Sequence, residues 1–131
     1  MIEYENTSGY QPGVCNIGPA EIQRRRQVGF LGLAAAVGIG AALLAVDAPA
    51  FTRLVVALPV AVGLGGFIQA RERFCAGFGM AGVQNMDELG SQIAIEAEEA
   101  RNADRRKAWR IHAMSMAGGL AAGFAFALLP V

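Results

Sequence analysis

The sequence is poor in the side chains that carry most enzyme chemistry. It contains one histidine and two cysteines, so it has no His-x-x-x-His pair, and no Ser/His/Asp set stands in it. The glycine-rich run at 77–82 lacks the Gly-Lys-Ser/Thr ending of a phosphate-binding loop and follows no predicted strand. We therefore predict a protein that is not an enzyme and that binds no cofactor.

The sequence also lacks an excess of either charge, a disulfide framework and a signal peptide. Lys+Arg and Asp+Glu number 11 each, so no net charge attracts nucleic acid. Two cysteines are too few for a disulfide scaffold. The first residues carry acid and have neither the basic nor the apolar region of a signal peptide, so we expect the first apolar block to stay in the membrane.

Long apolar blocks are what the sequence does have. Hydrophobic residues make up 54% of the chain, and they gather in three blocks, which is the membrane pattern. The blocks predict an all-α membrane protein with three transmembrane helices, at 19–46, 51–73 and 111–129. Pro59 predicts a bend in the second helix. A glycine-rich apolar loop at 74–86 should follow that helix.

No ionisable residue lies deep in any of the three predicted spans. Transporters and proton relays usually keep such a residue within the membrane, paired with a partner. Its absence argues against a pump or a carrier.

The start of the first helix is marked by local chemistry. Gly18 can cap it, Pro19 suits the first helical position because that position needs no N–H, and Glu21 complements the positive end of the helix dipole. A polar cytoplasmic arm at 1–18 should precede this helix.

The stretch 87–110 is charged and alanine-rich, with acids first and bases last. This order suits the helix dipole, so we predict a cytoplasmic helix that leads into the third span. Glu98 with Arg101, and Asp104 with Lys107, have the i,i+3 spacing of helical ion pairs.

The basic residues predict the orientation. With the N-terminus inside, ten of them are cytoplasmic and only Arg53 lies outside, so the positive-inside rule gives N-in and C-out. The ten are Arg24, Arg25, Arg26, Arg71, Arg73, Arg101, Arg105, Arg106, Lys107 and Arg110.

Each predicted span has small residues at four-residue spacing, which allow close helix contact in lipid. One interpretation is that these ridges pack the three spans on each other. The other is that one ridge, the third being favoured, docks a partner subunit or a second copy. The ridges are Gly32, Ala36 and Gly40; Ala57, Ala61 and Gly65; and Ser115, Gly119, Gly123 and Ala127.

Three residues are candidates for site chemistry: Cys15, Cys75 and His112. Cys15 precedes the first helix and Cys75 follows the second, so two antiparallel helices should bring them close. Three interpretations stay open. The thiols are buried small hydrophobes, a redox pair, or ligands of a thiophilic metal together with His112, a site that needs a further ligand.

Two boxes carry a resemblance. The first reads Cys15-Asn-Ile-Gly-Pro-Ala-Glu-Ile22, and the second reads Phe74-Cys75-Ala-Gly-Phe-Gly79, with Gly82-Val83 and Asn85 after it. Together, over about residues 13–86, they resemble a group of small bacterial inner-membrane proteins. The resemblance implies a multi-pass inner-membrane protein in which the two cysteines form a linked pair, and it implies no catalytic role.

The hypothesis that follows is a non-enzymatic accessory or assembly subunit of a membrane complex, with membrane lipids and a partner subunit or second copy as its contacts. The alternatives are a cytoplasmic-face thiol site, redox or metal-sensing, and a lipid-interacting scaffold. We predict structural or interaction roles for Asn16, Gly18, Pro19, Glu21, Gln69, Phe74, Gly77, Gly79, Asn85, Gly119 and Gly123.

Overall fold

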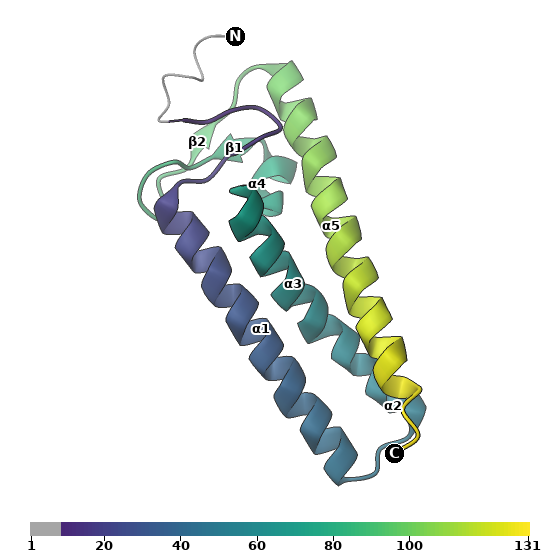
Figure 1. The fold of residues 1–131 in the computed structure, drawn as a ribbon. Coiled ribbons are helices and arrows are strands. Elements are labelled where there is room, and N and C mark those ends of the chain that lie inside the picture. Colours follow the sequence, from purple (N-terminus) through teal and green to yellow (C-terminus); the bar gives the residue numbers. More distant parts are fainter. Residues whose placement is uncertain (1–8) are drawn as a thin grey trace.

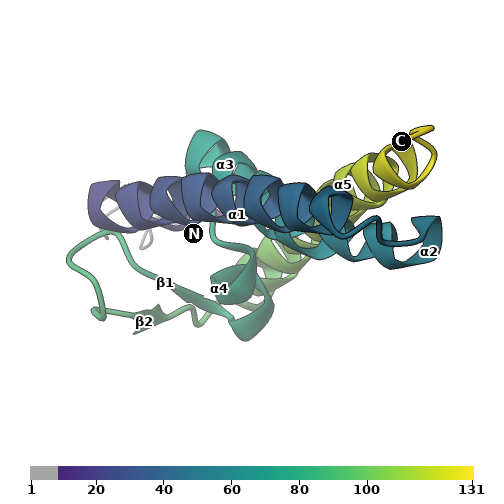
Figure 2. The same ribbon diagram turned by 90° about the horizontal axis from the view of Figure 1, so that it is seen from below.

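The protein is a bundle of three long helices with a small cap, made of residues 9–18 and 73–97, at one end (Figure 1). The computed structural model describes residues 9–131. Figure 2 shows the short elements of the cap grouped beside the long helices. In chain order the elements are α1 (Pro19–Ala45), α2 (Ala50–Arg53), the 3-10 turn η2 (Leu54–Val56), α3 (Ala57–Glu72), α4 (Ala76–Ala81), β1 (Val83–Gln84), β2 (Ile93–Ala94) and α5 (Glu98–Ala127).

Helix α1 begins where the sequence predicts. Gly18 is its N-cap in an extended conformation, Pro19 is the first helical residue, and Glu21 lies in the first turn. The proline removes one of the N–H groups that a helix start leaves without a partner.

The second apolar helix changes its winding just before Pro59. Residues Leu54–Val56 are a 3-10 turn between α2 and α3. Pro59 has no N–H to donate to the carbonyl of Val55, so the regular i to i−4 ladder is interrupted there.

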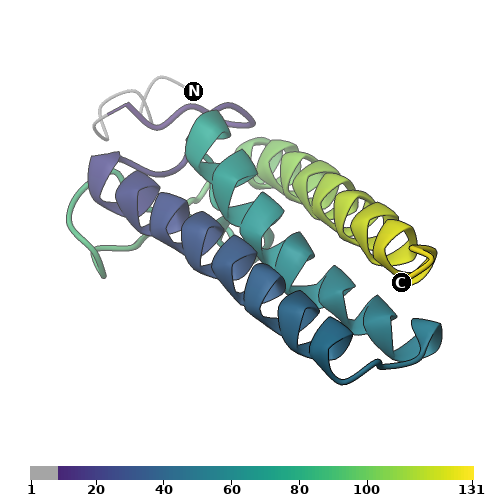
Figure 3. The ribbon, with the colours of Figure 1, turned by 60° about the horizontal axis from the view of Figure 1, so that its bottom comes forward.

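Helix α3 lies between α1 and α5 and contacts both of them (Figure 3). Glycines permit these contacts: a Cβ on Gly66 would lie 2.5 Å from the Gly29 nitrogen, and one on Gly119 would lie 2.6 Å from the Ala57 oxygen. Gly123 likewise faces Ala57. The small residues therefore pack the helices on each other. The ridge of α5, which the sequence favours for docking a partner subunit or a second copy, packs against α3.

Two helices are long and apolar enough to cross a membrane. They are Pro19–Ala45 and the combined helix Ala50–Glu72, by length and composition. Helix α5 carries its charged residues in its first half, and its apolar part begins only at Ile111.

The predicted helix at 87–110 is wrong in its first part, because α5 begins only at Glu98. Residues before it form a turn at Gly90, which has a φ of +90°, and strand β2, which pairs antiparallel with β1. From Glu98 onward the helix is continuous through Arg110 into the apolar half. The loop predicted at 74–86 is also more ordered than expected, since it contains α4 and β1.

The ion pairs predicted along this helix are replaced by other contacts. Arg101 donates to the carbonyl oxygens of Ile95 and Glu96 and so closes the turn before α5. Lys107 pairs with Glu72, its Nζ lying 3.1 Å from the carboxylate.

A candidate functional site in the cap

The cap consists of residues 9–18 and 73–97, and backbone hydrogen bonds join these two segments. The Asn16 N–H donates to the Arg73 oxygen at 3.1 Å, and the Asn85 N–H donates to the Asn16 oxygen at 2.9 Å. The Gly18 N–H then donates to the Asn85 oxygen at 2.9 Å. The two boxes of the sequence are therefore joined by backbone hydrogen bonds.

Asn16 is fully buried and binds the backbone of Cys75 with both ends of its amide. The Cys75 N–H donates to Asn16 Oδ1 at 2.7 Å, and Asn16 Nδ2 donates to the Cys75 oxygen at 3.2 Å. An asparagine has one acceptor and two donors on its side chain, so this pairing fixes the start of α4 against the arm.

A second polar chain runs from Asn85 to Cys75. Asn85 Nδ2 donates to Glu21 Oε2 at 3.0 Å, and the other Glu21 oxygen accepts from Arg25 at 2.9 Å. Arg25 Nη2 lies 2.8 Å from Cys75 Sγ, and its guanidinium carbon lies 5.6 Å from the Phe78 ring centroid. Because Glu21 and Asn85 are buried, their charge and polar atoms need these partners.

The two thiols lie in the same cap, are both buried and are both free. Cys15 Sγ donates to the Gly9 oxygen at 3.2 Å, whereas Cys75 Sγ accepts from Arg25 and, at 3.5 Å, from the Phe78 N–H. Each sulfur therefore has its own partners, and Asn16, which follows Cys15 in the chain, is bonded to the Cys75 backbone.

The predicted metal set is not brought together. His112 is exposed on α5, beside Trp109, with ring centroids 6.2 Å apart. Over residues 9–131, no three His, Cys, Asp or Glu side chains form a group that could hold a metal ion.

The remaining predicted residues have structural contacts, with one exception. Gln69 accepts from the Ala76 N–H at 2.8 Å, and Phe74 is fully buried. A Cβ on Gly18 would lie 2.2 Å from the Met86 oxygen, and one on Gly79 would lie 2.9 Å from the Asp104 oxygen.

The exception is Gly77. A Cβ there would meet only the Cys75 sulfur, at 3.8 Å. That is ordinary van der Waals contact, so space does not require a glycine at this position.

The sequence does not predict the hydrogen bonds that join residues 10–14 to α5. Asp104 is fully buried, and its carboxylate accepts from the Tyr10 hydroxyl at 2.8 Å and from the Gly13 N–H at 2.7 Å. Lys107 adds a bond to the Val14 oxygen at 3.1 Å. The signal in the sequence is that Asp104 shares one helix face with Ala100 and Ala108, four residues to either side, and both of these alanines are buried. The predicted ion pair with Lys107 hides this signal.

Burial raises the pKa of Asp104 above its usual value of 3.8. The bonds from Gly13 and Tyr10 and the charge of Lys107 lower it in part. The folded chain therefore holds this proton more tightly than the unfolded chain does.

From this raised pKa we predict a pH dependence of stability. The contribution of Asp104 to the free energy of unfolding is greatest below its unfolded pKa, and it falls as pH rises through the higher folded pKa. The difference in unfolding free energy between the native chain and Asp104→Asn should therefore shrink with rising pH and then level off. Denaturant titrations of both chains in one detergent, at a series of pH values from below 3.8 upward, measure this difference. Asp47→Asn, at an exposed site, is the control, and a difference that grows with pH contradicts the prediction.

Comparison of the chain with protein-family models, curated proteins and solved structures finds no match.

Proposed function

We propose that this chain is a non-enzymatic accessory or assembly subunit of a membrane complex. In this proposal it crosses the membrane three times, with the apolar half of α5 as the third span, and the cap lies in the cytoplasm. The ten basic residues at the cap end, against Arg53 at the other, support this orientation. The resemblance of the two boxes to small bacterial inner-membrane proteins supports that membrane as the location.

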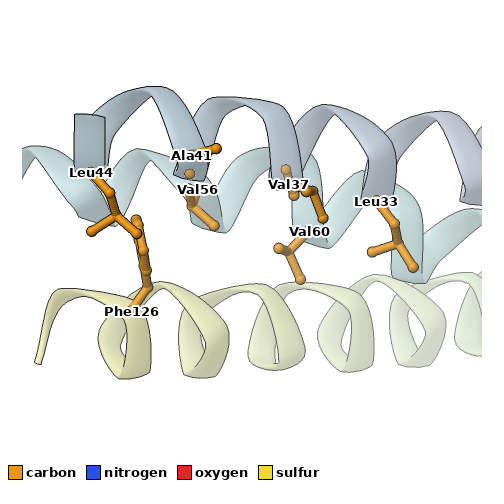
Figure 4. Close-up of a pocket in the computed structure, with 9 residues that line it drawn as sticks. Leu33, Val37, Ala41, Leu44, Val56, Val60 and Phe126 are labelled. Carbon is orange, nitrogen blue, oxygen red and sulfur yellow. The ribbon is translucent and has the colours of Figure 1, made fainter. Parts of the chain in front are cut away.

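A groove between α1 and α5 is the observation that carries the proposal. Both helices lie against α3 and leave between them an apolar space of about 530 Å³. In Figure 4 the labelled side chains gather in this space. They come from α1 (Leu33, Val37, Ala41 and Leu44), from η2 (Val56), from α3 (Val60) and from α5 (Phe126).

The floor of this groove suits a helix. Ala36, Gly40 and Ala41 line it, and small residues let the backbone of a second helix approach closely in lipid. The ridges of α3 and α5 are already used within the bundle, whereas Gly40 and Ala41 of α1 line this groove, so we assign the groove to a partner helix.

Site-specific photo-crosslinking tests the proposal. A photoreactive residue at Ala41, inside the groove, should capture one defined membrane protein in cells. The same residue at Ala42, which is exposed on α1 but outside the groove, should not. Native mass measurement after gentle extraction should show the same partner. Capture of lipid alone at both positions, with a monomer at every concentration, contradicts the proposal.

A thiol-sensing site centred on Cys75 is a second candidate, favoured by the contact between Arg25 and the sulfur. Reactive cysteines are found beside guanidinium groups. Maleimide labelling followed by mass measurement should modify Cys75 faster than Cys15, and Arg25→Gln should slow it several-fold. Arg26→Gln, which removes an exposed charge one residue away, is the control. If both thiols resist labelling equally in the folded chain, this candidate fails.

A further inference from the structure

A second groove lies between α1 and α3, nearer to the cap than the first. It has a volume of about 340 Å³ and only apolar lining residues. They are Val28, Leu31, Gly32, Ala35, Pro59 and Val62.

Arg24 stands at the head of this groove. It precedes Val28, Leu31 and Ala35 by four, seven and eleven residues, which places all four on one face of α1. Its side chain is exposed, and no acid within residues 9–131 pairs with it. Its neighbours differ, because Arg25 pairs with Glu21 and Arg26 bonds to Gln23.

We propose that this groove and Arg24 form a binding site for one anionic phospholipid, with an acyl chain in the groove and the phosphate on the guanidinium. The site rests on the membrane placement proposed above but not on the existence of a partner subunit. The cytoplasmic leaflet is the source of the ligand in this orientation, because it carries the anionic lipids.

The dimensions fit a lipid in one leaflet. From Val28 to Ala35 the groove follows α1 for roughly 10 Å, at 1.5 Å per residue. That is within the hydrocarbon depth of one leaflet, which is about 15 Å, half of the core of a bilayer. Arg24 lies about 6 Å further along the helix, where the headgroup phosphate of the same lipid would lie. A guanidinium offers two parallel N–H donors to a phosphate.

The charge of the site selects the ligand. A zwitterionic headgroup brings its own cation close to Arg24, whereas an anionic headgroup brings none. The first groove, between α1 and α5, lies nearer the far ends of these helices. The cation beside it, Arg53 over the Phe126 ring, is buried and already donates to the oxygens of Ala48, Leu129 and Val131, so we do not assign this groove the same ligand.

Native mass spectrometry of the full chain from nanodiscs tests the site. The nanodiscs contain phosphatidylglycerol and phosphatidylcholine in equal parts. The native chain should retain phosphatidylglycerol in preference, and Arg24→Gln should lower the retained fraction about fivefold, the expected effect of one basic residue. Arg106→Gln, which removes an exposed charge from α5, should leave it unchanged. Inorganic phosphate added instead of the anionic lipid should give no adduct.

A second pair of variants tests the groove itself. Ala35→Trp fills the groove and should abolish lipid retention with the charge intact, whereas Ala34→Trp, on an adjacent exposed position, should not. Thermal unfolding of each variant confirms that it is folded. Equal losses in Arg24→Gln and Arg106→Gln overturn the proposal in favour of a diffuse basic surface, and full retention by Ala35→Trp overturns the acyl-chain site. The crosslinking at Ala41 is a separate readout, so a missing partner and a missing lipid site are told apart.

Discussion

Gly66→Ala is expected to force α1 and α3 apart. A Cβ at this position would lie 2.5 Å from the Gly29 nitrogen and 2.6 Å from the Arg25 oxygen. Both are backbone atoms of α1 and cannot move alone, so the whole contact must open. We expect a loss of unfolding free energy at or above ~3 kcal/mol, the upper end usual for overpacking. Denaturant titration in detergent, followed by circular dichroism, measures it.

Gly38→Ala is the matched control, because a Cβ there meets nothing within 4 Å. Both changes add one methyl group to a glycine in a long helix, so their difference reports the helix contact alone. We expect Gly38→Ala to leave stability unchanged or slightly higher, since alanine favours helix over glycine. Equal stability of the two variants would show that α1 and α3 are not in contact at Gly66.

Asn16→Ala is expected to release the arm from the start of α4. The change removes both side-chain bonds to the Cys75 backbone and leaves the buried Cys75 N–H without a partner, whereas the Cys75 oxygen still accepts from the Gly79 N–H at 2.9 Å. A buried donor without a partner costs about 1–3 kcal/mol and the second lost bond about 0.5–1.5 kcal/mol, so the total loss of unfolding free energy should be about 1.5–4.5 kcal/mol. The same denaturant titration measures this loss, and it should come with faster labelling of Cys75.

Asn102→Ala serves as the control for this change. Asn102 is exposed on α5 and accepts only from Arg105, at 3.3 Å. Its replacement should change the unfolding free energy by no more than about 0.5 kcal/mol. If Asn16→Ala is as mild as Asn102→Ala, the cap is not held by this amide.

The helices that depend on local chemistry were predictable from the sequence. The apolar blocks located α1 and α3, and Gly18 with Pro19 located the first helical residue. Pro59 predicted a bend, and the structure has the 3-10 turn Leu54–Val56 just before it, because the ring and missing N–H of a proline act on its own helix. Such features depend on a few neighbouring residues, which a sequence displays directly.

The start of α5 was not predictable in the same way. The acids and alanines at 87–97 suit a helix, but the structure uses these residues for a turn at Gly90 and for pairing between β2 and β1. The partner strand and the buried cap decide the outcome, and tertiary contacts routinely override local propensity.

The candidate site was predicted in part. The sequence placed the two boxes together because antiparallel helices return the chain to the same end. It gave no sign that Tyr10 would bond to Asp104, 94 residues away. It also suggested a metal set with His112, which the structure leaves exposed on α5.

Amide hydrogen exchange in micelles tests the central claim most directly, which is that the N-terminal box and the box after α3 form one buried unit. The amides of Gly18, Cys75 and Asn85 lie outside the long helices and donate only across the two boxes. They should exchange as slowly as amides within α3, and Asn16→Ala should speed the exchange at Cys75. Exchange of all three at the rate of an unstructured chain would contradict the account.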